Sequence, residues 1–467
     1  MENKKNLQKD QLWQSLATAS SPEVATALRE AHDFYDGHRL VEWLANLYEP
    51  EIGGFYYSNS ARDNEPYRPD IESTAFALSL LTANGAIKDR NEDLPVDIQK
   101  KIVGFAKGLQ CETDGYFYHP QWPQGRENLA IDRYGRDIGN ACGVITGFRL
   151  DEDGSGVKRQ QHPNFCAPGA SKCKLHFGTN EQCVFPTVLK KVEKKSDAPA
   201  NKSNHPDYSS LEAFLCWVDE FNGGDEVKNN SGNAHLIESI RFEIHKYGYR
   251  EALLDYLDRV QGEIFDEQIA QGITPSGVFQ RCADYRAVWA FYKYTSIYDL
   301  NKDTSRKINI KYVPYIVDTF IKVIAMPPDG SYRINDVMNQ WIGVQRLINN
   351  VLKHYGEDEV EKIYERMRES AATLVHNTVE KLRAFKISDG SFAFNHDGTT
   401  LARIYSVPVS LGLAEGDVNS TLLALNTYRT MFSCLGYTPV PLFDEEDGER
   451  FVEIITNIKP PIKKSND

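Results

Sequence analysis

The sequence lacks any run of 18 apolar residues, so no segment is long and apolar enough to cross a membrane as a helix. Residues 1–10 are polar and have no apolar segment of the secretory kind, so we expect a cytoplasmic protein. Only eight cysteines are scattered over 467 residues, which indicates reduced thiols rather than a disulfide framework. Positive charge is also scarce, because Lys+Arg 53 stand against Asp+Glu 66, and a net charge of -13 argues against a general nucleic-acid binder.

Several catalytic signatures are missing as well. The chain contains no G-x-x-x-x-G-K-[ST] phosphate loop and no G-x-G-x-x-G turn that opens a helix after a strand. It also lacks the G-x-S-x-G nucleophile elbow and the H-E-x-x-H zinc pair. We therefore set aside the chemistries that these motifs serve.

What the sequence does contain is a pattern repeated five times. Each copy has a glycine turn, an aromatic residue, a variable loop, an acidic residue and a stretch with helical periodicity. The turns lie at 53–57, 114–118, 276–279, 329–332 and 389–392, and the acidic segments at 70–78, 136–140, 284–289, 335–337 and 417–421. Their irregular spacing does not fit a strict solenoid. The pattern predicts an all-α fold of helical hairpins, with further helices at 251–260 and 358–383 and with strands confined to the aromatic turns.

The glycine–aromatic turn at 53–57, followed by Asp70 and then Ser73-Thr74-Ala75, resembles the α/α-toroid superfamily. That group includes terpenoid cyclases, protein prenyltransferase β subunits and several polysaccharide lyases. The likeness covers roughly residues 50–440 and implies an (α/α)6-type toroid with short β-like turns, in a single domain over 1–467. Such motifs specify an architecture far better than a reaction.

If the hairpins close into a ring, all inner helices run the same way and their N-termini meet at one mouth. Acidic residues that open these helices would converge there. Asn419, two residues after Asp417, would lie at the same mouth. The acidic residues are Asp70, Glu72, Asp137, Asp284, Asp336 and Asp417. The alternative is that they only cap helices, because unpaired N–H groups and the helix dipole favour acids at these positions.

A long insertion at 150–210 departs from the repeat, and we expect it to lie over the mouth as a lid or binding loop. Thiolates and an imidazole suit zinc, and the insertion offers Cys166, Cys173, His176 and Cys183. Their spacing, C-x6-C-x2-H-x6-C, contains no C-x2-C pair, so buried free thiols are the favoured interpretation and we expect no cofactor.

The densest polar cluster falls in the second repeat and so at the expected mouth. It comprises His119, Trp122, Arg126, Arg133, Tyr134, Arg136, Asp137 and Asn140. Arginine binds carboxylates through a planar fork, a tryptophan face can stack on a sugar or hydrocarbon, and histidine and tyrosine can exchange protons. The cluster predicts an anion-recognising site; the alternative is an Arg–Asp network that braces loops.

Two further groups are candidates for the same mouth. His235 follows a Gly-Asn loop, just before a helix that carries Glu238, although a lone histidine there can simply cap or lie on the surface. Asp284-Tyr285-Arg286 repeats the acid–aromatic–base grouping at another inner helix.

Within the resemblance, the isoprenoid branch is weakened, because the D-x-D-D acid motif of class II terpene cyclases is missing and the prenyltransferase zinc set cannot be placed. We therefore expect a carbohydrate-active enzyme, with a lyase on uronate-containing oligosaccharides as the leading hypothesis. Arg136 and Asn140 would neutralise the uronate, and His119, Tyr134 and His235 would move protons. A glycoside hydrolase that uses a carboxylate pair, an isoprenoid enzyme that uses cation–π contacts, and a non-catalytic scaffold stay open.

Overall fold

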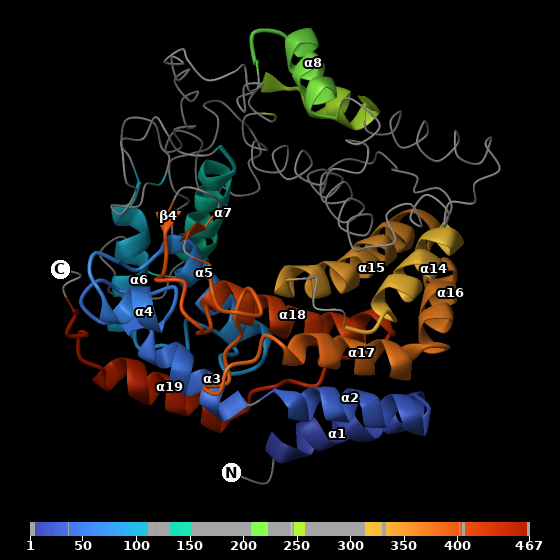
Figure 1. Cartoon of the computed structure of the whole chain (residues 1–467), viewed down its shortest axis with the longest axis horizontal. Helices are drawn as coiled ribbons and strands as arrows, with labels where there is room; N and C mark the ends of the chain where they lie inside the picture. Colours follow the sequence, from blue (N-terminus) through green and yellow to red (C-terminus); the bar gives the residue numbers. More distant parts are fainter. Residues whose placement is uncertain are drawn as a thin grey trace.

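The computed structural model describes residues 5–35, 37–110, 117, 131–148, 150, 207–222, 244, 247–256, 313–328, 333–400, 402–403 and 407–464. This part of the chain is mostly helical, which confirms the expected all-α class (Figure 1). Its helices are α1 (Lys5–Ala19), α2 (Pro22–Phe34), α3 (Gly37–Asn46), α4 (Asn59–Asp63), α5 (Ile71–Ala83), α6 (Val96–Gly108), α7 (Ile131–Gly147), α8 (Leu211–Asn222), α14 (Val313–Ile324), α15 (Ile334–Tyr355), α16 (Glu357–Arg368), α17 (Ala371–Arg383), α18 (Val418–Cys434) and α19 (Glu445–Asn457). Within the described ranges, no helix is both long and apolar enough to span a lipid bilayer.

An inner row of helices organises the described part. Helices α7, α5, α18 and α15 pack side by side in that order, although they come from distant parts of the sequence (Figure 1). A second layer covers the row: α6 packs on α7, α2 packs on α17 and α18, and α14 and α16 pack on α15. Closure of this row into a ring involves residues outside the described ranges and stays a prediction.

The described repeat turns are tight hairpins between an outer helix and the inner helix that follows. In the first unit, β1 (Tyr48–Glu49) pairs with β2 (Gly54–Phe55), with Tyr48 opposite Phe55. The same antiparallel pairing joins Gln110 to Phe117 and Lys386 to Phe392 in two later units. Gly53 and Gly390 occupy equivalent turn positions at φ of 88° and 90°, a backbone region that glycine enters without steric cost.

The hairpin is fastened to its inner helix by two hydrogen bonds that recur in the first and last units. The Phe55 N–H donates to Thr74 Oγ1 over 3.0 Å, and the Asp70 N–H donates to the Phe55 carbonyl over 3.1 Å. In the last unit, the Phe392 N–H donates to Thr421 Oγ1 over 3.1 Å, and the Asp417 N–H donates to the Phe392 carbonyl over 3.0 Å. The repeat in sequence is therefore a repeat in backbone geometry.

We expect Thr74→Val and Thr421→Val each to lower the free energy of unfolding by about 1–3 kcal/mol. Valine keeps the shape of threonine but removes the acceptor, which leaves the buried N–H of Phe55 or Phe392 without this bond. Thr82→Val is the matched control, because its hydroxyl only bonds back to carbonyls of its own helix. Chemical denaturation checks this, and a control loss as large as the other two would contradict it.

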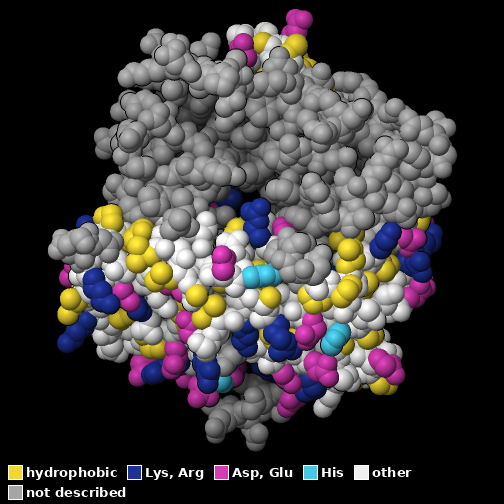
Figure 2. Space-filling view, viewed as in Figure 1, with side chains coloured by type: hydrophobic (Ala, Val, Ile, Leu, Met, Phe, Trp, Pro, Cys, Tyr) yellow, Lys and Arg dark blue, Asp and Glu magenta, His cyan; other side chains and the backbone are white. Residues whose placement is uncertain are grey.

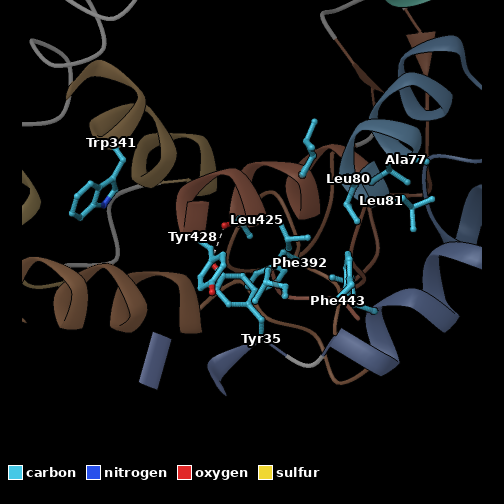
Figure 3. Close-up of a cluster of buried hydrophobic side chains, with 14 of the residues drawn as sticks. Tyr35, Ala77, Leu80, Leu81, Trp341, Phe392, Leu425, Tyr428 and Phe443 are labelled. Carbon is cyan, nitrogen blue, oxygen red and sulfur yellow. Dashed lines mark hydrogen bonds between the residues drawn. The ribbon is translucent and has the colours of Figure 1, made fainter. Parts of the chain in front are cut away.

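The aromatic surplus is largely structural in the described part. Phe55, Phe117 and Phe392 of the turns are at most 1% exposed. Figure 3 shows Tyr35, Phe392 and Tyr428 gathered below α18, and the hydroxyls of both tyrosines donate to backbone carbonyls over 2.7 Å. These rings fill the space between the inner row and the outer layer, so they do not mark a cavity.

Two expectations about local structure were wrong. The helix expected over 358–383 is interrupted at Glu369 and Ser370, between α16 and α17. Both halves contact α14 and α15, but α16 packs chiefly on α15 and α17 chiefly on α2. Strands are also not confined to the aromatic turns, since β3 (Ala402–Arg403) pairs with β4 (Val407–Pro408).

The net negative charge is not gathered on the face shown in Figure 2. There, lysine, arginine, aspartate and glutamate side chains alternate over short distances on the described surface. A mixed surface of this kind does not indicate a binding site for a strongly charged partner on this face.

Candidate functional site

The inner helices begin at a common end, which we call the helix-start face. The start of α18 is tied to the first unit, because the Val418 N–H donates to the Tyr57 carbonyl over 3.0 Å. The start of α15 is tied to the last unit through a 3.3 Å bond from the Ile334 N–H to the Phe394 carbonyl. An ion pair between Glu72 and Arg136 joins the first turn of α5 to α7. The starts of α5, α18 and α15 are therefore linked to one another, and the second turn of α7 joins them through Arg136.

Two of the acidic residues expected there, Asp70 and Asp417, cap helices. The Asp70 carboxylate accepts from the Glu72 and Ser73 N–H groups, at 2.8 and 3.2 Å. Asp417 accepts from the Ser420 N–H over 2.7 Å, and its other oxygen accepts from hydroxyls of Ser420 and Thr399. Both are at most 3% exposed. In the structure, both carboxylates stabilise the N-terminal ends of α5 and α18.

Two other predicted residues lie at equivalent helix starts. Asp336 is in the first turn of α15, where its carboxylate accepts from the Arg333 N–H over 2.8 Å. Asn419 is the second residue of α18, the position that Glu72 occupies in α5, and it is 2% exposed. The structure thus brings Glu72 and Asn419 to matching positions on neighbouring helices.

The ion pair between Glu72 and Arg136 joins a buried carboxylate to a partly exposed guanidinium. Glu72 is 1% exposed, whereas the Arg136 side chain is 24% exposed. A buried carboxylate needs a cation or donors to offset its desolvation. Because a guanidinium carries five N–H donors in a fixed fork, Arg136 can hold Glu72 and present further donors on its exposed side.

Helix α7 begins earlier than the repeat suggested. We expected Asp137 to open the helix, but α7 starts at Ile131, so Asp137 lies in the second turn and Arg133 and Tyr134 are helical. The apolar positions of α7 continue backwards past Asp137 to Ile131, and Gly135 weakens a helix without ending it. Asp137 is 1% exposed and faces the interior rather than capping an end.

Arg136 and Asn140 are four residues apart and so share one face of α7. The Asn140 Nδ2 is buried and has no hydrogen-bond acceptor among the described residues. The same holds for the hydroxyl of Ser73, in the first turn of α5, and for Oδ1 of Asn335, at the start of α15. Buried polar atoms nearly always have a partner, so these three atoms are exceptions among the described residues.

Glu415 is a site residue that sequence reasoning missed. Its carboxylate accepts from the Ser58 hydroxyl over 2.9 Å, from the Ser60 N–H over 2.8 Å and from the Ser60 hydroxyl. Burial raises the pKa of Glu415, although these hydrogen bonds lower it, and the nearby charge of Asp417 raises it further. Its partners lie about 355 positions away in the chain, so no local pattern could have indicated the contact.

Tyr67 is next to this carboxylate and closes the group. Burial, and then the negative charge of Glu415, raise the pKa of the Tyr67 hydroxyl, which donates to the Ser410 carbonyl over 3.0 Å. Residues 58–67 and 410–417 therefore meet through a buried, hydrogen-bonded carboxyl group. That group joins the first repeat unit to the last one.

The remaining predicted residues lie outside what the structure describes. They are His119, Trp122, Arg126, His235, Asp284, Tyr285 and Arg286, the cysteine–histidine set of the insertion, and nearly all of 150–210; for Arg133 and Tyr134 only the backbone is described. Within the described ranges, no group of three His, Cys, Asp or Glu side chains could hold a metal ion. The cysteines described there, Cys142, Cys216 and Cys434, are not in disulfides.

No protein-family model, curated protein or solved structure matches this chain. The likeness to α/α-toroid enzymes therefore rests on the short motifs alone.

Proposed function

We propose that the chain is a carbohydrate-active enzyme that acts at the helix-start face and cleaves uronate-containing oligosaccharides by β-elimination. The observation that carries the proposal is the donor face of α7, where the Arg136 guanidinium, braced by buried Glu72, lies one turn before Asn140. We also propose that the inner row closes into an (α/α)6-type toroid and that the helix-start face is its mouth.

The chemistry explains why such a donor face matters. A uronate carboxylate must be neutralised before the proton on the adjacent carbon can be removed. Arg136 offers a charged planar fork and Asn140 an amide N–H, which together can bind both carboxylate oxygens. Because Glu72 fixes the guanidinium before substrate arrives, little ordering is required at the moment of reaction.

Proton transfer completes the elimination. A general base removes the proton from the carbon next to the carboxylate, a carbon–carbon double bond forms, and the glycosidic oxygen leaves and takes up a proton. Under the proposal, His119 or His235 serves as the base and Tyr134 protonates the leaving oxygen. These assignments follow from residue type and position in the chain.

Glycoside hydrolysis is the second candidate, and Glu415 favours it. A carboxyl group whose pKa is raised by burial is what a general acid needs. Hydrolysis also needs a second carboxylate, and its distance from the first depends on whether the reaction retains or inverts the sugar configuration. Glu72, at the start of α5, is a candidate for this second carboxylate. This route leaves no unsaturated product.

The test is a cleavage screen with the full chain against uronate-containing and neutral polysaccharides. Elimination is expected to raise ultraviolet absorbance as unsaturated ends form, together with new reducing ends. Reducing ends without that absorbance would establish hydrolysis instead.

Tyr134→Phe and His119→Ala should each lower turnover by roughly 10²–10⁴-fold. Full turnover in these variants and in an Arg136 variant would refute the proposal, and no cleavage of any substrate would favour a scaffold.

A further inference from the structure

An arginine without a charged partner lies on α18, away from the helix-start face. Arg429 is the twelfth residue of α18, about 16 Å along the axis from the start of the helix. Among the described residues, its guanidinium has no hydrogen bond, ion pair or ring contact, and only its backbone carbonyl is bonded by a side chain, the Ser433 hydroxyl. Carboxylates are abundant in this chain, with Asp+Glu 66 against Lys+Arg 53, so the missing partner requires an explanation.

Arg429 is also half-buried. Burial alone lowers the pKa of its guanidinium, since no carboxylate is close enough to raise it. By contrast, the more exposed Arg366 and Arg450 each pair with two carboxylates. Burying part of a charge is unfavourable unless the charge is paired. The position of Arg429 would therefore be stabilised by an anion from outside the described residues.

A second hydrogen-bond donor lies on the same face of α18. Asn426 precedes Arg429 by three residues, so the two side chains share a face of the helix. Asn426 is partly exposed, and its side-chain amide makes no hydrogen bond with the described residues. A guanidinium and an amide N–H are thus available one turn apart. We call this pair the α18 donor pair.

The α18 donor pair lies on the side of α18 that is turned away from α15. Cys434, whose Sγ donates to the Trp341 carbonyl of α15 over 3.4 Å, is about 140° around the helix from Arg429. Tyr428 is turned to the outer layer, where it packs on Tyr35 (Figure 3). The neighbour of α18 on its other side in the row is α5 (Figure 1).

Helix α5 leaves the surface at this level accessible. Ser79 is the ninth residue of α5, as Asn426 is of α18, and the two helices start at the same end. Ser79 is exposed. Each of the two helices carries a single charged side chain, Glu72 on α5 and Arg429 on α18. Because Glu72 is paired with Arg136, no carboxylate of either helix repels an anion at Arg429.

The donors favour a carboxylate over a phosphate. A guanidinium matches the two oxygens of a planar carboxylate through parallel N–H donors. Phosphate sites commonly use the free N–H groups of a helix N-terminus, but Arg429 lies in the middle of α18, where those groups are bonded within the helix. Asn426 and Ser79 add neutral donors, which suit the hydroxyl groups of a sugar.

We propose that the α18 donor pair binds the carboxylate of a uronate, with Ser79 available to a hydroxyl of the same ring. The anion site stands on Arg429 itself, whereas the choice of a uronate as the ligand rests on the proposed function. The ligand can come from two sources. It is either a free uronic acid or a further unit of a chain that is held at the helix-start face.

The test is protection of Arg429 from the arginine reagent phenylglyoxal in the full wild-type chain, read peptide by peptide by mass spectrometry. Galacturonate and trigalacturonate are the acidic probes, and glucose and inorganic phosphate are the controls. We expect galacturonate to slow modification of Arg429 saturably, with a Kd of about 1 mM, and glucose to have no effect. Tighter protection by trigalacturonate identifies a chain unit as the source, and equal protection identifies the free acid.

Exposed Arg366 serves as the internal control, and its modification should not respond to galacturonate. No protection of Arg429 by either acidic probe, or protection by phosphate or glucose as strong as that by galacturonate, would overturn the proposal. This assay needs no substitution, so it does not depend on the folding of a variant.

Variants separate this site from the helix-start face. In the Glu72→Gln/Arg136→Gln background, which removes the other proposed carboxylate site, Arg429→Gln should weaken galacturonate binding at least about tenfold by calorimetry. Arg450→Gln, at an exposed position of α19, is the matched control. Protection of Arg429 without cleavage of any acidic oligosaccharide would refute the cleavage proposal alone, and cleavage without protection would refute this one alone.

Discussion

Replacing Arg136 with alanine is expected to lower the free energy of unfolding by about 3–5 kcal/mol, because the buried Glu72 carboxylate then loses this ion pair. Glu72→Gln should cost less, since Arg136 is partly exposed and can be solvated. The double variant Glu72→Gln/Arg136→Gln should recover much of the loss, because two neutral amides can still hydrogen-bond across α5 and α7. Denaturant unfolding of the full set of variants gives the coupling energy directly.

The same double variant separates folding from chemistry. Under the proposed function its turnover of an acidic oligosaccharide should fall by roughly 10²–10³-fold, because the guanidinium of Arg136 no longer binds the uronate. A pair that only braces α5 against α7 would leave turnover intact once the double variant is folded. Glu380→Gln/Arg383→Gln, an exposed pair on α17, is the control and should change stability by less than about 0.5 kcal/mol.

Glu415→Ala is the second large effect, with an expected loss of about 2–5 kcal/mol in the free energy of unfolding. The substitution removes the acceptor for the Ser60 N–H and for the hydroxyls of Ser58 and Ser60, all of them buried. It also loosens a junction between residues 58–60 and the last unit. Glu449→Ala, at an exposed position of α19, should stay within about 0.5 kcal/mol of wild type.

The pKa of Glu415 adds a pH signature with a definite sign. Its pKa is raised above the ordinary 4.5, chiefly by burial, so the folded chain binds this proton more tightly than the unfolded chain does. The stabilisation from this group is therefore complete below about pH 4.5 and is lost as pH rises through the folded pKa. Relative to Glu415→Gln, wild type should lose stability as pH increases over that window. Unfolding curves at several pH values test this, and a difference that is constant or that grows with pH would contradict it.

Asp447 shows why the comparison uses a variant of Glu415 alone. Burial also raises the pKa of Asp447, and its contact with His38 raises the pKa of that imidazole. Both groups contribute with the same sign as Glu415. Only the difference between wild type and Glu415→Gln isolates the junction at Ser58 and Ser60.

The repeat units were predictable because their signals are local. Gly53 and Gly390 mark turns whose positive φ favours glycine, and Asp70 and Asp417 satisfy N–H groups two or three residues ahead. The position of Asp137 was mispredicted because the same local pattern was applied to it. The repeat placed it at a helix start, but the apolar periodicity that determines where α7 begins runs through it.

By itself, the sequence determined the hairpins, the capped helices and the acidic character of their starts, since turns and caps depend on groups within about four residues of one another. Only the tertiary structure decided that α7, α5, α18 and α15 lie in a row and that Arg136 pairs with Glu72. It also decided that Glu415 accepts from Ser58 and Ser60. The two side-chain contacts join residues 64 and about 355 positions apart, and no local spacing encodes them.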